Sequence, residues 1–144
     1  LLGHFVAINP LTGEKKWEVP LTDFPSSAGM LVTGGGLVFT GKLTGEFIAL
    51  DEATGETLWQ FKTGSSINST AITYTHNGRQ YVTVASGLGG GLANRYAAGQ
   101  VPTGGSVWTC AVMPEQLAGS SRGNTTMMPR VRSVEARKKR VHIR

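Results

Sequence analysis

The chain contains one phrase twice: Val6-Ala7-Ile8-Asn9-Pro10-Leu11-Thr12-Gly13-Glu14-Lys15-Lys16-Trp17 and Ile48-Ala49-Leu50-Asp51-Glu52-Ala53-Thr54-Gly55-Glu56-Thr57-Leu58-Trp59. Trp17 and Trp59 lie 42 positions apart, and so do Gly13 and Gly55. A repeat of about 40–45 residues is typical of the blades of a β-propeller. Because a blade needs neighbours to bury its faces, so few copies predict a part of a larger repeat structure.

Short runs rich in β-branched and aromatic residues surround this phrase, each bounded by Gly, Asn, Asp or Pro. They predict strands at residues 4–9, 15–19, 29–33, 37–40, 46–51, 57–62, 70–75, 80–86 and 106–113. No amphipathic helix is predicted. With four strands to a blade, the strands form half a blade, a complete blade and three-quarters of a blade. We therefore expect an all-β fold that is an incomplete fragment of about two to two and a half blades.

One connection breaks the repeat. The link between the second and third strands is short in the complete blade, Gly41 to Gly45, and long in the last blade, Gly87 to Gly104. A loop of that length inside a compact domain is usually functional or disordered. Because strand direction alternates, this loop should lie at the same end as the segments that lead into the blades, Leu21 to Ala28 and Thr63 to Ser69. The Thr-Gly-Glu turns should lie at the other end, so the long loop marks the predicted ligand face.

The repeated phrase is interpreted as scaffold. Glycine supplies a turn conformation that other residues resist, and an aspartate side chain can accept hydrogen bonds from turn amides. The large apolar tryptophans are expected to pack between blades, each indole N–H needing one partner. The predicted structural residues are Trp17, Trp59, Gly13, Gly55 and Asp51.

The glycine-rich stretch Gly87-Leu88-Gly89-Gly90-Gly91 invites a phosphate-loop interpretation, but its spacing misses the dinucleotide fingerprint and no helix pattern follows. Glycines also let a backbone approach a flat ligand closely. The three histidines lie far apart without partners at metal-ligand spacing, and no nucleophile–base constellation is visible. Cys110 is the single cysteine, which excludes an internal disulfide and a Cys-rich zinc site. No apolar run is long enough to span a bilayer, and no signal peptide is visible.

Charge divides the 144 residues in two. Residues 1–116 carry six basic and eight acidic residues, whereas residues 117–144 carry eight basic residues and Glu135 alone. The tail contains Arg137-Lys138-Lys139-Arg140, a run that can bind nucleic acid or serve as a nuclear address. No aromatic residue interleaves with it, and its apolar residues show no period. We expect a disordered basic tail or a sequence foreign to the fold, with nucleic-acid binding, which would be salt-dependent, as the alternative.

The segment from Gly3 to Glu115 resembles the C-terminal end of quinoprotein alcohol dehydrogenases of the methanol/ethanol type. The resemblance is carried by the two Ala-x-Asn/Asp-x-x-Thr-Gly-x-x-x-Trp phrases, then by Thr33 to Gly41, Asn77 to Gly87 and Gly104 to Trp108. Nothing after Gln116 matches. These oxidoreductases are eight-bladed propellers that use pyrroloquinoline quinone (PQQ). The division expected is therefore residues 1–116 as C-terminal blades and residues 117–144 as a tail outside the family pattern.

The resemblance implies oxidation of a small primary alcohol to an aldehyde in the bacterial periplasm. PQQ would accept the hydride equivalents, a calcium or lanthanide ion would polarise it, an aspartate would act as base, and a cytochrome c would take the electrons. The metal ligands and the catalytic aspartate lie earlier in such proteins, so neither is expected in this chain.

What carries over is a contribution to the cofactor rim from Gly89, Gly90, Gly91, Leu88 and Ser27. The chain departs from the family pattern at two places in this rim. The chain has Ser27-Ala28-Gly29 where the family often has Trp-Gly-Gly, and Leu88 or Gly91 where the family often has a tryptophan in the loop.

In that family, the last strand of the closing blade comes from the protein's N-terminus. Without it and the missing N-terminal blades, two sheet edges should stay open, and the chain alone should be inactive and prone to aggregate. The alternative is a non-enzymatic propeller of the same superfamily, serving as a scaffold or binding module. An Asp-x-Asp/Glu metal site in the upstream sequence would discriminate the two.

Overall fold

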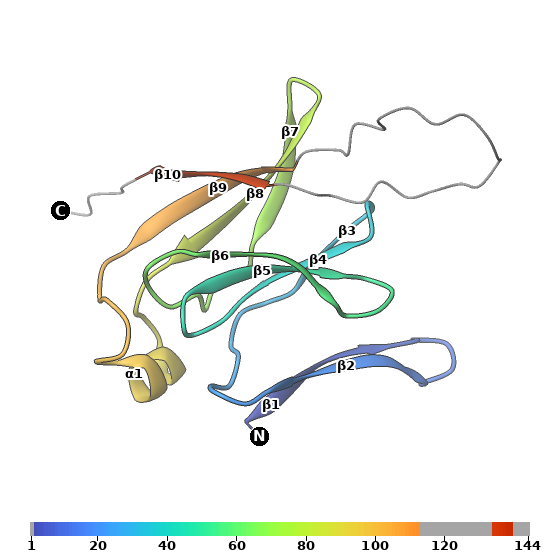
Figure 1. Ribbon diagram of the computed structural model, residues 1–144, viewed down its shortest axis with the longest axis horizontal. Helices are drawn as coiled ribbons and strands as arrows, with labels where there is room; N and C mark the ends of the chain where they lie inside the picture. The colour runs from blue at the N-terminus through green and yellow to red at the C-terminus, as the bar shows by residue number, and fades with distance from the viewer. Residues whose placement is uncertain (1, 113–133, 140–144) are drawn as a thin grey trace.

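The computed structural model describes residues 2–112 and 134–139, and Figure 1 shows three antiparallel sheets side by side. The first sheet pairs β1 (Gly3–Ile8) with β2 (Lys15–Leu21). The second has the order β3 (Leu31–Thr33), β4 (Leu37–Gly41), β5 (Glu46–Asp51), β6 (Thr57–Lys62). The third has the order β10 (Val134–Lys139), β9 (Ser106–Val112), β8 (Arg79–Ser86), β7 (Ile72–His76). The all-β prediction is confirmed.

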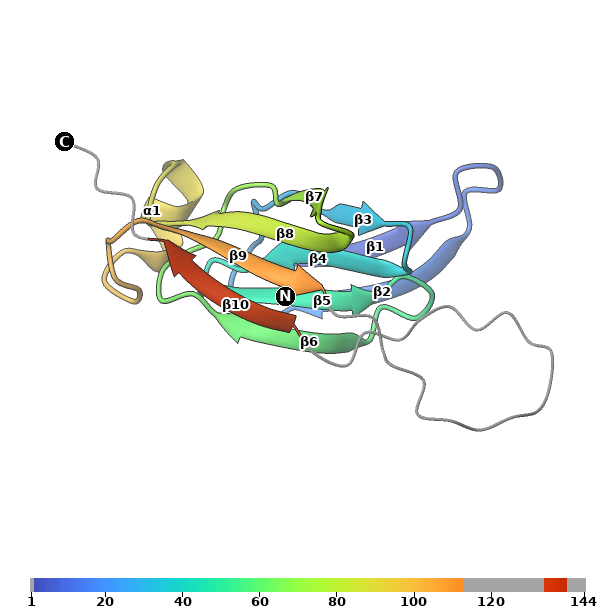
Figure 2. The same cartoon turned by 90° about the horizontal axis from the view of Figure 1, so that it is seen from above.

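The second sheet lies in the middle and is covered on both faces. One face packs Leu37 and Phe39 against Val82 and Val84 of the third sheet. The other face packs Val38 against the first sheet, so every residue of β4 is buried. A strand covered on both faces has a continuous hydrophobic sequence rather than an alternation of apolar and polar residues. Figure 2 shows the resulting stack from above.

The second and third sheets repeat each other in register. Val38 pairs with Leu50 between β4 and β5, and Val82 pairs with Cys110 between β8 and β9. All four side chains are buried. The last blade therefore repeats the strand pairing of the complete one.

The 42-residue repeat also returns as a local irregularity of the backbone. The register of β1 and β2 shifts between Ala7 and Ile8, and that of β5 and β6 shifts between Ala49 and Leu50. In both pairs a tryptophan stands opposite the alanine, Trp17 in the first sheet and Trp59 in the second. One extra residue in a strand increases its local twist, so each copy of the phrase builds the same bent strand pair.

The long loop contains a helix that the sequence did not predict: α1 spans Gly91–Ala97. Its buried residues, Ala93 and Ala97, are four positions apart and pack against Leu43 at the end of the second sheet. Seven residues make only two turns, too short a window for a helical period to stand out. The expectation that no helix is present is corrected here, and tertiary packing explains it.

The tail differs from the expected disorder at one segment. Residues 134–139 form β10, which pairs with β9 from Val134↔Val112 to Lys139↔Val107. The edge of β9 is therefore not open, contrary to the expectation of an absent fourth strand. An unpaired edge presents free N–H and C=O groups to any nearby chain, and main-chain pairing does not require an apolar pattern. The other tail residues, 117–133 and 140–144, lie outside the described residues.

Candidate functional site

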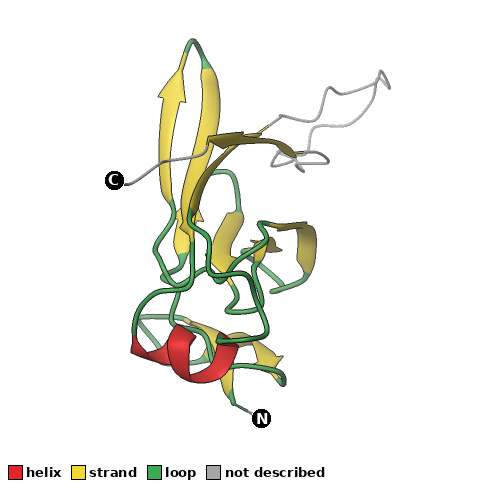
Figure 3. Ribbon diagram, turned by 90° about the vertical axis from the view of Figure 1, so that its left-hand side faces the viewer, coloured by secondary structure: helices red, strands yellow, loops and turns green. Residues whose placement is uncertain are grey.

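The loops of the chain gather at the end of the sheets that carries α1. Leu43, Ala93 and Ala97 form a buried cluster there, and Phe24 of the segment that leads into β3 packs against it. Figure 3, which views the molecule from this end, shows α1 in the foreground. The structure thus brings together the leading segment and the long loop, as the alternation of strand direction predicts.

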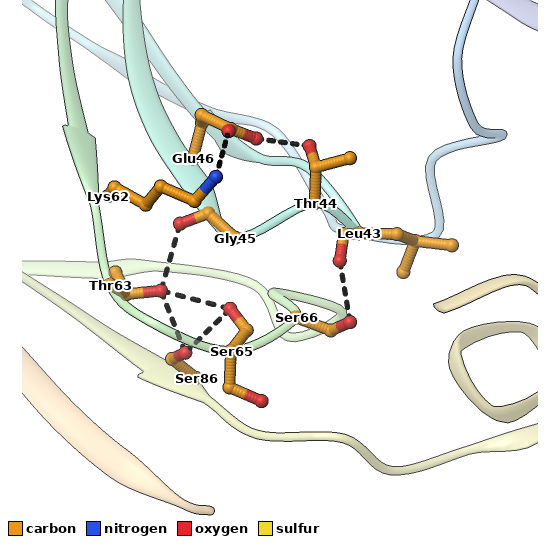
Figure 4. A network of polar contacts seen from close by, with 9 residues as sticks. All are labelled: Leu43, Thr44, Gly45, Glu46, Lys62, Thr63, Ser65, Ser66 and Ser86. Carbon is orange, nitrogen blue, oxygen red and sulfur yellow. Dashed lines mark hydrogen bonds and ion pairs between the residues drawn. The ribbon is translucent and has the colours of Figure 1, made fainter. Parts of the chain in front are cut away.

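Buried hydroxyl groups fix where the long loop begins (Figure 4). Thr63 Oγ1 lies 2.8 Å from Ser86 Oγ and 2.9 Å from the carbonyl oxygen of Gly45. Ser86 Oγ donates to the carbonyl oxygen of Ser65 at 2.9 Å. Because a buried hydroxyl without a partner costs free energy, this closed set of bonds holds the last residue of β8 firmly against the second sheet.

The same segment, residues 63–69, holds both arms of the long loop. The N–H of Gly87 donates to the carbonyl oxygen of Ser66 at 2.8 Å. Asn68 Nδ2 donates to the carbonyl oxygen of Gly89. Ser65 Oγ donates to the carbonyl oxygen of Pro102 near the other end of the loop. The loop is therefore positioned by side chains rather than left loose.

The glycines that Asn68 positions form an open strip of backbone. A Cβ added at Gly89 or Gly91 would meet no atom within 4 Å. Gly90 has a φ of +77° and precedes α1, a conformation that glycine adopts without strain. No side chain therefore stands over the strip at Gly89 and Gly91, which leaves room for a ligand close to the main chain.

The two other predicted rim residues are placed differently. Leu88 is half-buried and packs against the cluster of Leu43, Ala93 and Ala97. Ser27 is exposed in the segment that leads into β3. Next to it, Ser26 Oγ donates to the carbonyl oxygen of Gly41 at 3.3 Å. Leu88 thus supports the loop from inside, while Ser27 faces solvent at the same end of the molecule.

The repeated phrase adds a polar contact between the first two sheets and closes its own turn. Trp17 Nε1 donates to the carbonyl oxygen of Glu52 at 2.8 Å, and the indole ring lies against Gly55. Asp51 Oδ1 accepts the N–H groups of Ala53 at 2.8 Å and of Thr54 at 2.9 Å. Trp17 therefore holds the first sheet on the second, whereas Asp51 closes the turn of its own strand pair.

A model of the PQQ-dependent "Glucose/ethanol/alcohol dehydrogenase, beta-propeller domain" matches residues 2–82, more than half of the chain. The chain belongs to this quinoprotein family. It is 45% identical over 98 residues to "Putative dehydrogenase XoxF" of Paracoccus denitrificans and 43% identical over 98 residues to "Lanthanide-dependent methanol dehydrogenase" of Methylorubrum extorquens. Each alignment covers 68% of this chain but 16% of the relative, so the chain spans about a sixth of their length.

Solved quinoprotein structures show the same arrangement of strands. A "Europium-containing methanol dehydrogenase" aligns with a TM-score of 0.65 and 32% identity over 74% of this chain and 22% of its own. The quinohemoprotein alcohol dehydrogenase of Comamonas testosteroni aligns with a TM-score of 0.65 and 31% sequence identity. This alignment covers 85% of this chain and 18% of that protein. The chain is therefore a part of a quinoprotein propeller.

The residues at the loop end of this quinoprotein fragment fit a flat quinone only as one side of its site. The open strip at Gly89 and Gly91 can lie against a ring system. In the described part of the chain, no group of three His, Cys, Asp or Glu residues is placed to hold a metal ion. Burial raises the pKa of the Cys110 thiol to about 11, so it stays protonated and is a poor nucleophile. The described residues at this end can offer main-chain contacts to such a ligand.

A groove lies away from this end of the sheets. It has a volume of about 580 Å³, opens between the first and second sheets and is lined by Val6, Ile8, Met30, Val32 and Val38 among others. The first sheet has two strands where the other sheets have four. The groove therefore marks where the first sheet stops short, and we do not assign the cofactor to it.

In the portion that the structure describes, no helix is long and apolar enough to cross a membrane.

The anchors of the long loop could not be found from the sequence. Asn68 and the hydroxyls of Thr63 and Ser86 bond to main-chain oxygens or to one another, and such partners make no sequence motif. The available signal was a run rich in hydroxyl side chains, residues 63–70, in the segment that leads into the blade of the glycine loop.

Proposed function

We propose that the chain is the C-terminal part of a periplasmic PQQ-dependent dehydrogenase that oxidises a primary alcohol to an aldehyde. Residues 1–116 would be propeller blades and residues 117–144 an extension outside the family pattern. Support comes from the family match and from relatives named as methanol and ethanol dehydrogenases, including "Methanol dehydrogenase [cytochrome c] subunit 1" of Methylobacterium organophilum. By the same likeness, we propose a cytochrome c as the electron acceptor of the whole protein.

The role of this chain in that protein would be to build the scaffold and part of the cofactor rim. The observation that carries this role is the open backbone strip at Gly89 and Gly91, held by Asn68 at the end where the loops meet. Gly90 and the exposed Ser27 complete the proposed rim. Leu88 would act from beneath, by holding the strip in place.

When bound, PQQ supplies the acceptor for the electrons of the alcohol, together with a calcium or lanthanide ion that polarises it. The ion's ligands and the catalytic base would lie in the upstream blades. This chain would then orient the quinone through main-chain contacts and keep water from one side of it. A preorganised surface of this kind lowers the entropic cost of binding.

A chimera tests this role. Residues 1–112 would replace the matching C-terminal segment of the lanthanide-dependent methanol dehydrogenase of Methylorubrum extorquens, and PQQ would be titrated into the apo protein. We expect the chimera to bind PQQ. Gly89→Val should weaken binding by about tenfold or more, because the side chain would occupy the space of the ligand.

Gly104→Val is the matched control, since a Cβ there also meets no atom within 4 Å. It should leave PQQ affinity unchanged. A folded chimera that fails to bind PQQ, or equal losses in the two variants, would overturn the proposed rim.

A further inference from the structure

The groove between the first and second sheets exposes a concave apolar surface. Val6, Ile8, Met30 and Val32 line it, and these side chains are from 37% to 59% exposed. Its volume of about 580 Å³ lies within the range of sites that take up a sizeable apolar group. Covering this surface with another apolar surface removes it from water, which is favourable.

A second exposed apolar surface lies on the β7–β8 hairpin. Ile72 and Tyr74 are 61% and 44% exposed, and they point to the same face of β7 because they are two positions apart. Tyr81 of β8 lies opposite Tyr74, and the two rings stack at 5.5 Å. These three residues form what we call the hairpin ridge. The hairpin that carries it projects from the rest of the fold (Figures 1 and 3).

The hairpin ridge and the groove of one chain face different ways. Val82 and Val84 of β8 pack on the second sheet, so Tyr81, next to Val82 in the strand, points away from it. The groove opens on the other side of the second sheet, toward β1 and β2. Figure 1 shows β7 and the β1–β2 pair on opposite sides of that sheet. A ridge that enters this groove must therefore come from another molecule.

The charges of the two surfaces are complementary. Glu14 and Glu52 line the groove, and neither forms an ion pair with a described residue. Lys15 and Lys16 line it as well, but Lys15 is already held in an ion pair on β2. The β7 and β8 strands contain no acidic residue, and Arg79 lies beside their turn. A basic hairpin is thus better suited to the groove than an acidic one.

We propose that the hairpin ridge of one copy of this chain docks in the groove of a second copy. Ile72 and Tyr74 would cover the apolar lining, and the basic turn would meet the carboxylates that line the groove. Because a ridge binds a groove, every pair of copies keeps one free ridge and one free groove. Such a heterologous contact builds open chains of copies unless the rotation closes a ring. This inference does not depend on alcohol oxidation.

Two lysine variants of the full 144-residue chain test the contact by sedimentation velocity. Val32→Lys blocks the groove and leaves the ridge intact, whereas Tyr74→Lys does the reverse, because an unpaired ammonium group resists burial. The unmodified chain should form species larger than dimers as its concentration rises. Each variant alone should need about tenfold more protein, or above, to associate. Their equimolar mixture should form dimers and nothing larger, because one intact ridge then meets one intact groove.

Thr75→Lys is the matched control for the ridge. Thr75 is exposed on the same strand as Tyr74 but points to the opposite face. The substitution adds the same charge and should leave association unchanged. Ile72→Lys and Ile8→Lys block the ridge and the groove at two strongly exposed positions. They take the place of either variant if it fails to fold.

Four results would overturn the proposal. The first is an unmodified chain that stays monomeric at every concentration. The second is a Tyr74→Lys chain that associates as the unmodified chain does, which would mean that another part of the second copy enters the groove. The third is an equal loss of association in Thr75→Lys and Tyr74→Lys. The fourth is a mixture of the two blocked variants that remains monomeric, since the intact ridge and the intact groove would then not bind each other.

Discussion

At the residue scale, the contact of Trp17 with Gly55 holds the first sheet on the second. A Cβ at Gly55 would lie 2.7 Å from the indole ring, closer than real side-chain contacts allow. Gly13, at the same place in the other copy of the phrase, has nearly the same φ, +75° against +76°, but no atom within 4 Å. Substitutions at the two glycines therefore separate two contributions to the free energy of unfolding. At Gly13 a side chain only strains the left-handed backbone, whereas at Gly55 it also displaces the Trp17 ring.

Gly13→Ala should lower the free energy of unfolding by about 1 kcal/mol, which is the cost of a side chain at positive φ. Gly55→Ala should cost about 1–3 kcal/mol more, because the added methyl must displace the Trp17 ring. Urea denaturation followed by circular dichroism measures both. Equal losses in the two variants would show that the tryptophan contact contributes nothing.

Asn68 gives a second prediction at this scale. Asn68→Asp keeps the shape of the side chain but removes the donor to the carbonyl oxygen of Gly89. We expect faster amide exchange over residues 87–91, corresponding to about 1–3 kcal/mol of local stability. Asn94→Asp, an exposed change on α1, adds the same charge and should leave the loop unaffected. Unchanged exchange in the Asn68 variant would contradict the anchoring role.

At the element scale, the ends of β5 and β6 are joined by an ion pair between Glu46 and Lys62 at 3.3 Å. Partial burial raises the pKa of Glu46, but hydrogen bonds from Thr44 and the main chain, together with Lys62, outweigh it. The pKa therefore lies below the ordinary value of 4.5. A lowered pKa in the folded state means that the carboxylate stabilises the fold above pH 4.5, and that this stabilisation is lost as the pH falls through the folded-state pKa.

Glu46→Gln should therefore be less stable than the unmodified chain at neutral pH and equally stable once the carboxyl is protonated. The difference should stay below about 1 kcal/mol, because Lys62 is exposed and the pair is screened by water. Denaturation midpoints measured from neutral to acidic pH give the curve. Glu56→Gln, an exposed change on the β5–β6 turn, is the control and should show a smaller dependence. If the stability difference between Glu46→Gln and the unmodified chain grows on acidification, the pKa of Glu46 is not lowered by folding, and the prediction is contradicted.

Strands could be predicted from sequence wherever a pattern and a turn coincided. β5 and β6 have the predicted bounds because Gly45 and the Asp51–Gly55 turn delimit them. α1 could not be predicted, since two turns of helix are stabilised by Leu43, which is distant in sequence. β10 could not be predicted either, because it forms by pairing with the edge of β9 and its own sequence has no strand pattern. The loop end was predicted from strand direction, but its anchors depend on main-chain oxygens, which no sequence pattern reports.

At the scale of the whole molecule, the chain leaves apolar surface where the first sheet ends. Val32 is 59% exposed and lines the groove beside β1 together with Val6 and Ile8. An apolar sheet surface beside an unfilled strand position invites association with other chains. The isolated chain is therefore expected to associate with itself through this groove.

Val32→Lys should reduce that self-association, because burying an unpaired ammonium group in the contact is costly. Leu11→Lys is the matched control, since Leu11 is 93% exposed at a turn and is not among the residues that line the groove. Sedimentation velocity over a range of concentrations compares the three proteins. If both variants associate as strongly as the unmodified chain, the groove is not the contact.

The chain is a part of a quinoprotein propeller, and we predict that dehydrogenase activity requires the remaining blades. The most direct measurement is reduction of an artificial electron acceptor by a primary alcohol in the presence of PQQ and calcium or a lanthanide ion. We predict no turnover by the 144-residue chain alone and PQQ-dependent turnover by the chimera with the methanol dehydrogenase. Turnover by the isolated, monomeric chain, or a folded chimera without PQQ-dependent turnover, would contradict the claim.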